Sequence, residues 1–289
     1  MRWLVVARRE GRDVARSRAL RALVALFVLV GIAAVAVPAT AFDGRLPADR
    51  ALAFLVAPLK LVVGLAGLLA GQGAIAAPRT GGQLKLTLGL PIPRTALVLG
   101  AFLGRAVVVL AGTAAGLLAV AMALVVVHGT LPTALLGEFA ALLGLFAVTA
   151  TAVGVGLSAA SPTRGVAAAA ALGAFVLFQF FWGVVPGGVH YAIEGSLPGT
   201  VVPPWVVLLE RLQPFAAFEA AAEHLLPAAG GAVRLSGEGA AATGSGPSSA
   251  RLAGDPPAYL GLWAAVATLA GWAVGALAIG AARFARADL

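Results

Sequence analysis

The chain has 289 residues, of which 61% are hydrophobic and 11% charged, and its mean hydropathy is +0.98. A soluble domain carries roughly 25% charged residues, so this composition excludes a soluble protein and indicates a membrane protein. The net charge of +8 does not indicate nucleic acid as a partner, because the basic residues stand at the ends of apolar runs. The absence of cysteine excludes disulfides, thiolate metal sites and a cysteine nucleophile.

The first 21 residues are strongly basic, with seven arginines and two acids. Trp3 and Leu4 can share a helix face opposite Arg8 and Arg9, which predicts an amphipathic helix over residues 1–21 on the inner leaflet of a membrane. The pattern leaves open a second interpretation, a charge cluster that only sets the topology of the first span. The segment is not a signal peptide, because the apolar run after it is too long and lacks a cleavage site.

Six apolar segments are long enough to cross a bilayer as helices, because about 20 helical residues cover its core of roughly 30 Å. The fold class that they predict is all-α: a polytopic membrane protein with six transmembrane helices, forming one domain over residues 1–289. The predicted spans are residues 22–42, 51–78, 106–127, 139–160, 165–186 and 258–282.

The loop over residues 78–105 orients the whole chain. It carries four positive charges, Arg79, Lys85, Arg94 and Arg105, and no acid. Positive residues beside a span resist translocation, so we expect this loop in the cytoplasm. Both termini then lie in the cytoplasm as well, and the chain is a multi-pass protein of the plasma membrane.

Lys60 is the one charge that interrupts the second span. We expect its stem to lie in lipid and its ammonium group to reach the headgroups, and a role in a substrate path is the alternative. Glycines recur in the second and third spans and favour close approach of neighbouring helices. They are Gly64, Gly67, Gly71 and Gly73, and the pair Gly112 and Gly116.

Residues 187–257 form a long external region before the last span. Residues 203–226 are apolar but carry several charges, and Pro214 interrupts them. Two short helices at or dipping into the outer interface fit this pattern better than a seventh span. Residues 228–257 are rich in Gly, Ala, Ser and Pro, which predicts a flexible loop.

The chain lacks the residues that catalysis or ion coupling needs. A P-loop requires lysine directly after glycine, whereas Lys60 and Lys85 both follow leucine. Ser158 lies near the inner face and the histidines at the outer face, which argues against an intramembrane serine protease. The histidines also have no paired metal-ligand spacing, and no carboxylate lies in mid-membrane to relay protons. These histidines are His128, His190 and His224.

Three stretches of the chain resemble the permease subunits of ABC-2 type transporters. ARREGRDVARSRALRALVALFVLVG is similar to the amphipathic entry helix of that family, and AIAAPRTGGQLKLTLGLPIPRTALVLGAFLGR to its cytoplasmic segment. RFARADL resembles the ending of the branch that includes the permease of the nitrous-oxide reductase maturation system. The resemblance implies an exporter powered by a separate ABC ATPase subunit, with ATP on that partner and no cofactor or enzyme activity in this chain. It also implies a dimer of two copies, or of one copy and a similar permease.

In that family the cytoplasmic segment contacts the ATPase, so the resemblance implies a contact site after the second span. The family usually has glutamates where this chain has Pro78 and Thr80. The alternative is a plain loop whose charges only set topology. The candidate contact residues are Arg79, Gly81, Gly82, Gln83, Leu84 and Lys85.

Two other functions remain as alternatives at this point. A non-transport membrane scaffold or assembly factor for an external partner needs no ATPase, and its test is whether an ATPase co-purifies. A stand-alone secondary transporter ranks third, because ionisable groups within the spans are nearly absent. The spans offer mainly Ala, Val, Leu and Gly, so no substrate can be inferred from them.

Overall fold

The computed structural model describes residues 18–41, 47–82, 93–199, 201–226, 251–252 and 256–287. Within these ranges the chain is helical, with one isolated β-bridge between Val202 and Leu252 and no strand. Residues 1–17 of the predicted helix over residues 1–21 lie outside the described residues. Its last four residues, 18–21, form the beginning of the first long helix. Most of the predicted loop 228–257 lies outside them too.

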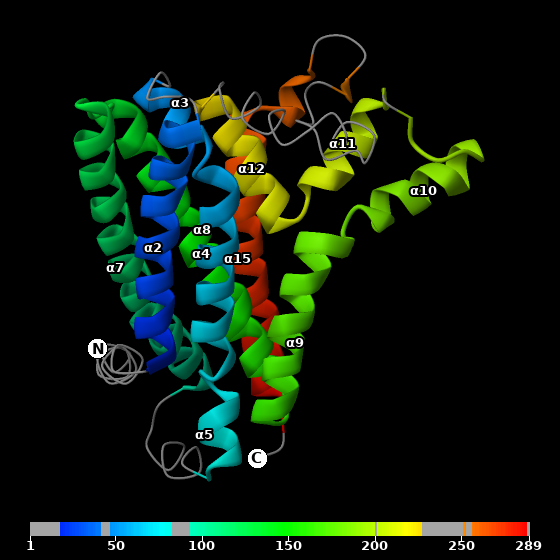
Figure 1. Cartoon of the computed structure of the whole chain (residues 1–289). Coiled ribbons are helices and arrows are strands. Elements are labelled where there is room, and N and C mark those ends of the chain that lie inside the picture. Colours follow the sequence, from blue (N-terminus) through cyan, green and yellow to red (C-terminus); the bar gives the residue numbers. More distant parts are fainter. Residues whose placement is uncertain are drawn as a thin grey trace.

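Six helical segments of the described chain are long and apolar enough to cross a membrane, as predicted. They form the bundle of Figure 1, and the all-α polytopic architecture is confirmed. The segments are α2 (Arg18–Ala41), α4 (Val56–Gln72) with α5 (Ala76–Thr80), α7 (Arg94–His128), α8 (Thr133–Ala160), α9 (Arg164–Val176) with the π-helical Leu177–Phe181, and α15 (Leu262–Ala285). The shorter elements are α3 (Ala48–Ala53), α10 (Val184–Glu194), α11 (Pro204–Arg211), α12 (Pro214–Leu225) and a 3-10 turn at Ala258–Leu260.

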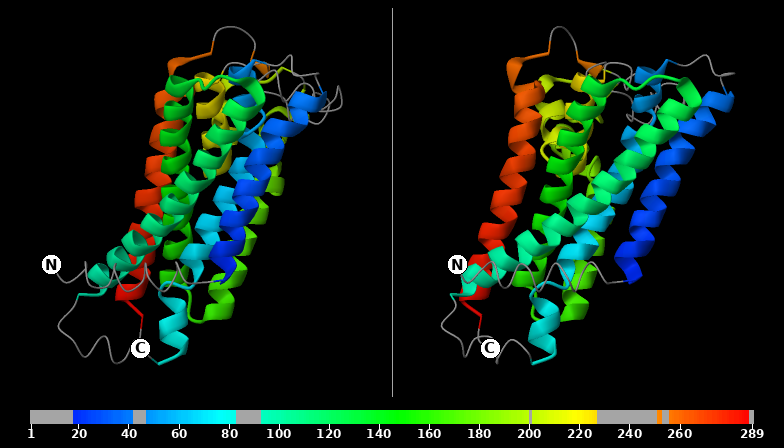
Figure 2. Two further views of the ribbon diagram at one scale, coloured as in Figure 1. Left: turned by 60° about the vertical axis from the view of Figure 1, so that its left-hand side comes forward. Right: turned by 90° about the vertical axis from the view of Figure 1, so that its left-hand side faces the viewer.

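Helix α8 occupies the middle of the bundle, and Figure 2 shows α2 and α15 on opposite sides of it. Glycines let its neighbours come close. A Cβ atom at Gly71 of α4 would lie 2.5 Å from the backbone nitrogen of Val155, and one at Gly156 would lie 2.7 Å from the carbonyl carbon of Ala276 in α15. Such distances leave no room for a side chain, so the prediction of close helix approach is confirmed at Gly71.

The third span begins earlier than predicted. Helix α7 starts at Arg94, so Arg105 lies inside a helix and not in the predicted loop. The Arg105 guanidinium donates to the carbonyl of Ala70, in the last turn of α4. Carbonyls in a last helical turn lack intrahelical partners and attract cations, which explains how α7 includes a charge that the sequence placed in a loop.

The two short helices predicted in residues 203–226 are confirmed as α11 and α12, separated just before Pro214. Helix α12 enters the bundle between α8 and α15 (Figure 1). Its Phe215 and Phe218 are buried, and their ring centroids lie 5.1 and 4.8 Å from that of Phe146 in α8. Rings at these separations stabilise the contact beyond the area they bury, so α12 belongs to the core.

The prediction that Lys60 reaches the headgroups is wrong. Its side chain does not reach outward to headgroups but is buried, and its Nζ lies 2.5 Å from Oε1 of Glu219 in α12. A buried ammonium group is tolerated when an opposite charge compensates it. Because α12 folds back into the bundle, it supplies that carboxylate from 159 positions along the chain.

Candidate functional site

The two ends of the bundle differ in charge. Every described acidic residue lies on or near the short helices at one end, which we call the acidic end; they are Asp49, Glu138, Glu194, Glu210, Glu219 and Glu223. The opposite end, where α2 begins and α15 ends, we call the basic end. Its described charges are all arginines: Arg18, Arg21, Arg79, Arg94, Arg105, Arg164, Arg283 and Arg286.

Helix α5 projects from the basic end beyond the long helices (Figure 1). Of the six predicted contact residues, Arg79, Gly81 and Gly82 are described, and Gln83, Leu84 and Lys85 lie outside the described residues. Gly81 ends α5. Gly82 has φ of 73°, is exposed, and would have nothing within 4 Å of an added Cβ. The left-handed backbone there explains the glycine, because other residues adopt it at a cost.

Arg79 turns back toward the bundle instead of projecting from it. Its Nη1 donates to the carbonyl of Ser161, in the turn between α8 and α9, at 2.7 Å. Its Cζ lies 5.2 Å from the ring centroid of Phe284, in the last turn of α15, within cation–π range. Arg79 therefore ties α5 to two neighbouring segments, and among the described contact residues Gly81 and Gly82 are the ones that face outward.

Arg94 caps the end of α15 from the first turn of α7. Its Nη1 lies 3.0, 2.9 and 3.0 Å from the carbonyl oxygens of Phe284, Ala285 and Ala287. Its Cζ is 5.7 Å from the Phe284 centroid, so both guanidinium groups contact one aromatic ring. The carbonyls at a helix end favour a cation, and Arg94 supplies it.

Ser158 caps the beginning of α5 from a different helix. Its Oγ accepts hydrogen bonds from the backbone N–H groups of Ile75 at 3.0 Å and Ala76 at 3.1 Å, and the side chain is fully buried. At the other end of α5, Thr80 Oγ1 accepts from the backbone N–H of Arg164 at 3.2 Å. Sequence reasoning missed this cap, because no sequence motif marks a serine that bonds to the backbone of a distant segment.

The model of the ABC-2 family transporter protein matches residues 4–289. The chain belongs to the ABC-2 transporter family. It is also 30% identical, over 244 residues, to the probable ABC transporter permease protein NosY of Pseudomonas aeruginosa, with 81% of this chain and 86% of that protein covered.

This ABC-2 permease is therefore a multi-pass membrane protein of an ABC transporter, as the sequence predicted. Permeases of ABC transporters work with an ATPase partner and are in general not catalytic themselves. In the described part of the permease, no group of three or more His, Asp or Glu side chains could hold a metal ion. What the basic end offers chemically is a set of arginines and a projecting helix, which suits a protein contact.

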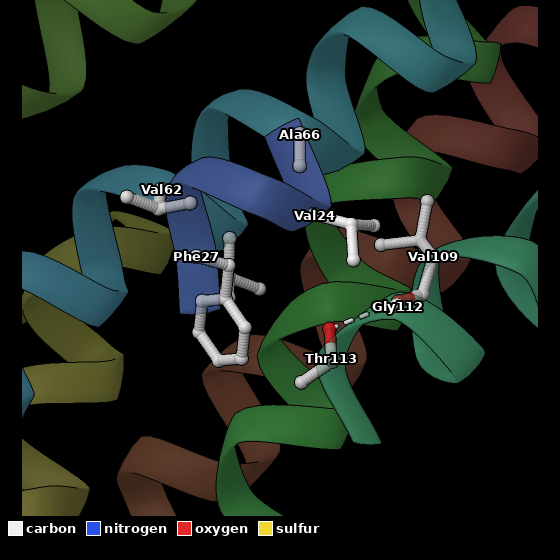
Figure 3. Close-up of a pocket in the computed structure, with 8 residues that line it drawn as sticks. Val24, Phe27, Val62, Ala66, Val109, Gly112 and Thr113 are labelled. Carbon is white, nitrogen blue, oxygen red and sulfur yellow. Dashed lines mark hydrogen bonds between the residues drawn. The ribbon is translucent and has the colours of Figure 1, made fainter. Parts of the chain in front are cut away.

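A hollow of about 20 Å³ lies between α2, α4 and α7 (Figure 3). Apolar side chains line it, including Phe27, Val62 and Val109, and the Thr113 hydroxyl bonds to the Val109 carbonyl within its own helix. The space is about that of one water molecule, so it is too small for a transported substrate.

The acidic end of the permease holds its short helices by ion pairs. Arg211 donates to the Leu260 carbonyl at 2.6 Å, and its Nη2 lies 3.6 Å from Oε2 of Glu223. Arg211 lies outside the six candidate spans. Burial lowers the pKa of Arg211, and the carboxylates of Glu223 and Glu210 act in the opposite direction. These contacts fix α11, α12 and the turn before α15 to one another.

Proposed function

We propose that this permease is the membrane subunit of an exporter, with its basic end and both termini in the cytoplasm. The observation that carries the orientation is the segregation of charge: the described basic end carries eight arginines and no acid. Positive residues beside spans remain on the cytoplasmic side. The ATP that powers transport is bound by the partner subunit, and this chain carries no cofactor.

The ATPase subunit docks on the projection formed by α5, Gly81, Gly82 and the segment that follows. Gly81 and Gly82 support this proposal because both are exposed at the tip of the projection. We assign Gln83, Leu84 and Lys85 to the same contact, where a leucine at the centre and a lysine at the rim would suit a partner groove. Arg79 acts as the tether of α5 and not as a direct contact, because its Nη1 is bonded to Ser161.

The permease works as a pair, with a second copy or with a similar permease, and the transport path lies between the two. Support comes from the distribution of burial. The span segments of α9 and α15 are 17% and 11% buried, whereas that of α8 is 67% buried. Few residues of α9 and α15 are thus fully buried within one chain, and both spans retain exposed surface for lipid or a second subunit.

Leu84→Asp tests the docking proposal. We expect the variant to insert normally and to lose the ATPase, because the charge is placed in an apolar protein contact and costs several kcal/mol there. The measurement is ATPase retention and permease-stimulated hydrolysis after purification in mild detergent. Thr95→Asp is the matched control, because it adds the same charge at an exposed position of the basic end outside the proposed contact, and it should retain the ATPase. Full retention with Leu84→Asp would refute docking on this segment, and absence of any ATPase from the wild-type preparation would favour a scaffold.

A further inference from the structure

Helix α5 is bound to the same short stretch of chain at both of its ends. Ser158, in the last turn of α8, accepts the first two N–H groups at one end. Thr80, at the other end, accepts the N–H of Arg164, the first residue of α9. Between them Arg79 donates to Ser161. One short helix is thus fixed by four hydrogen bonds that involve side chains to the end of α8, the turn after it and the start of α9.

These bonds matter because α5 is not continuous with the span before it. Helix α4 ends at Gln72, and a turn over residues 73–75 separates it from α5. Ile75 stands at the N-cap of α5, where its side chain makes no capping bond. The first N–H groups of a helix have no intrahelical partner, so those of α5 depend on Ser158. Without Ser158, these N–H groups would lose their acceptor, and α5 would be held through Arg79 and Thr80 at its other end.

Ser158 lies where α4 and α8 touch through their backbones. Gly71 of α4 and Val155 of α8 are too close for a Cβ atom between them. Helix α8 then continues through the middle of the bundle and packs against α12 and α15. If α5 and α8 move together, a displacement of α5 therefore also moves the centre of the permease. If the turn at residues 73–75 bends instead, α5 moves alone and α8 stays in place.

We propose that Ser158 is a positioning residue for ATP-driven transport: its Oγ locks α5 onto α8, so that movement imposed by the ATPase on α5 drives α8. This inference rests on the proposed function, in which the ATPase docks on α5 and the residues after it. Ser158 acts through α5 and contacts neither ATP nor the transported molecule.

The test uses the full-length permease with its ATPase, reconstituted in lipid nanodiscs. Ser158→Ala removes the acceptor and leaves the fold's packing volume nearly unchanged. Ser158→Thr retains the acceptor and is the conservative rescue. Thr151→Val is the matched control, because Thr151 is a fully buried hydroxyl of the same helix that donates only within that helix, to Ala147.

We expect Ser158→Ala to retain the ATPase and its KM for ATP, and to lower the kcat of permease-stimulated hydrolysis roughly fivefold or more, within the range of measured coupling factors. Ser158→Thr should restore the kcat, and Thr151→Val should behave as the wild type. A general loss of folding would instead reduce retention and thermal stability along with kcat.

A covalent tie provides a second measurement. Thr80 Oγ1 and the backbone nitrogen of Arg164 are 3.2 Å apart, so the two residues are neighbours, and a pair of cysteines there can be tested for disulfide formation because the chain has no other cysteine. In the Ser158→Ala background, oxidation of the Thr80→Cys, Arg164→Cys pair should restore stimulated hydrolysis, and reduction should abolish the restoration.

Four outcomes would overturn the inference. An unchanged kcat with Ser158→Ala, or an oxidised pair that forms but restores nothing, would overturn it while the proposed docking stands. A loss with Thr151→Val as large as that with Ser158→Ala would also overturn it, since any buried hydroxyl would then have the same effect. A wild-type permease that retains no ATPase would overturn the proposed function, and the inference with it.

Discussion

The ring of Phe215 in α12 occupies the space beside Gly64 of α4, where an added Cβ atom would lie 2.6 Å from its Cζ. The absence of a side chain at Gly64 is what allows α12 to insert among the spans. Phe146 packs against the same ring from α8. A short helix from the acidic end is thereby built into the core of the bundle.

Gly64→Leu should displace this ring and destabilise the permease by about 1–3 kcal/mol, the usual effect of overpacking a core. Thermal unfolding of the purified chain in detergent measures the loss. Gly271→Leu is the matched control, because a Cβ atom at Gly271 meets nothing within 4 Å in the described part of the chain. Equal unfolding temperatures for the two variants would contradict the packing described for α12.

The pair formed by Lys60 and Glu219 predicts an asymmetric double-mutant cycle. The side chain of Lys60 is 7% exposed and that of Glu219 is 40% exposed. Glu219→Gln leaves a buried ammonium group without its partner and should cost about 3–5 kcal/mol, whereas Lys60→Met leaves a carboxylate that water can reach and should cost less. The double variant should recover part of the loss from Glu219→Gln. Strictly additive effects would show that the two groups do not interact in the membrane.

The orientation predicts a labelling pattern in intact cells. Single cysteines at Thr95 and Thr163, both exposed at the basic end, should be shielded from an impermeant thiol reagent, and one at Ser245 should react. The native chain has no cysteine, so the background reaction is absent. Permeabilised cells, in which both basic-end positions should react, provide the control. Reaction at Thr95 in sealed cells would reverse the proposed orientation.

The bonds from Arg94 predict local stability at the end of α15. Arg94→Gln removes a charged donor from the carbonyls of Phe284 and Ala285, and hydrogen bonds to charged groups contribute about 1.5–3 kcal/mol. The backbone amides of the last turn of α15 should then exchange with deuterium faster than in the wild type, by the factor that this loss of free energy implies. Arg283→Gln is the control, because Arg283 is exposed in the same turn. Equal exchange in both variants would show that Arg94 does not hold this end.

The region before α15 divides into two parts that should respond differently to deletion. Removing residues 228–249 should leave insertion and thermal stability unchanged. Extending the deletion through Leu252 removes the bridge to Val202 and the 2.7 Å ion pair between Arg251 and Glu210. That longer deletion should lower the unfolding temperature. Residues 251–252 of the predicted loop over residues 228–257 are thus bonded to the chain before and within α11, and a neutral longer deletion would show that these contacts contribute no stability.

The six spans could be predicted because length and apolar composition are local properties of the sequence. The end of the basic loop could not, because Arg105 enters a helix only by virtue of the Ala70 carbonyl that meets it. The same holds for Lys60, whose partner Glu219 reaches it only after α12 has folded back. Both Arg105 and Lys60 were predicted at an aqueous or headgroup face, whereas a partner that is distant in sequence holds each of them within the bundle.

The structure describes three of the six candidate contact residues, and their contact with an ATPase stays a prediction. The sequence placed this candidate site after the second span, and the projecting α5 with Gly81 and Gly82 lies there. The inward direction of Arg79 depends on Ser161 and Phe284, which are far away in sequence. The cap by Ser158 was missed for the same reason. Its partners are backbone N–H groups, which nearly every residue has, so no residue type in the sequence indicates the contact.

The bridge between Val202 and Leu252 joins the two ends of the long segment before α15, so we expect the covalent link between them to be dispensable once the protein has folded. Helix α15 is also held by the indole of Trp272, which donates to the Leu212 carbonyl at 2.7 Å, and by its packing along α8. The permease can therefore be treated as two complementary fragments that meet at this bridge. A chain cut between residues 228 and 249 should migrate as one particle in mild detergent and as two bands after denaturation. Such a split form would allow α15 to be labelled or exchanged separately from the other five spans.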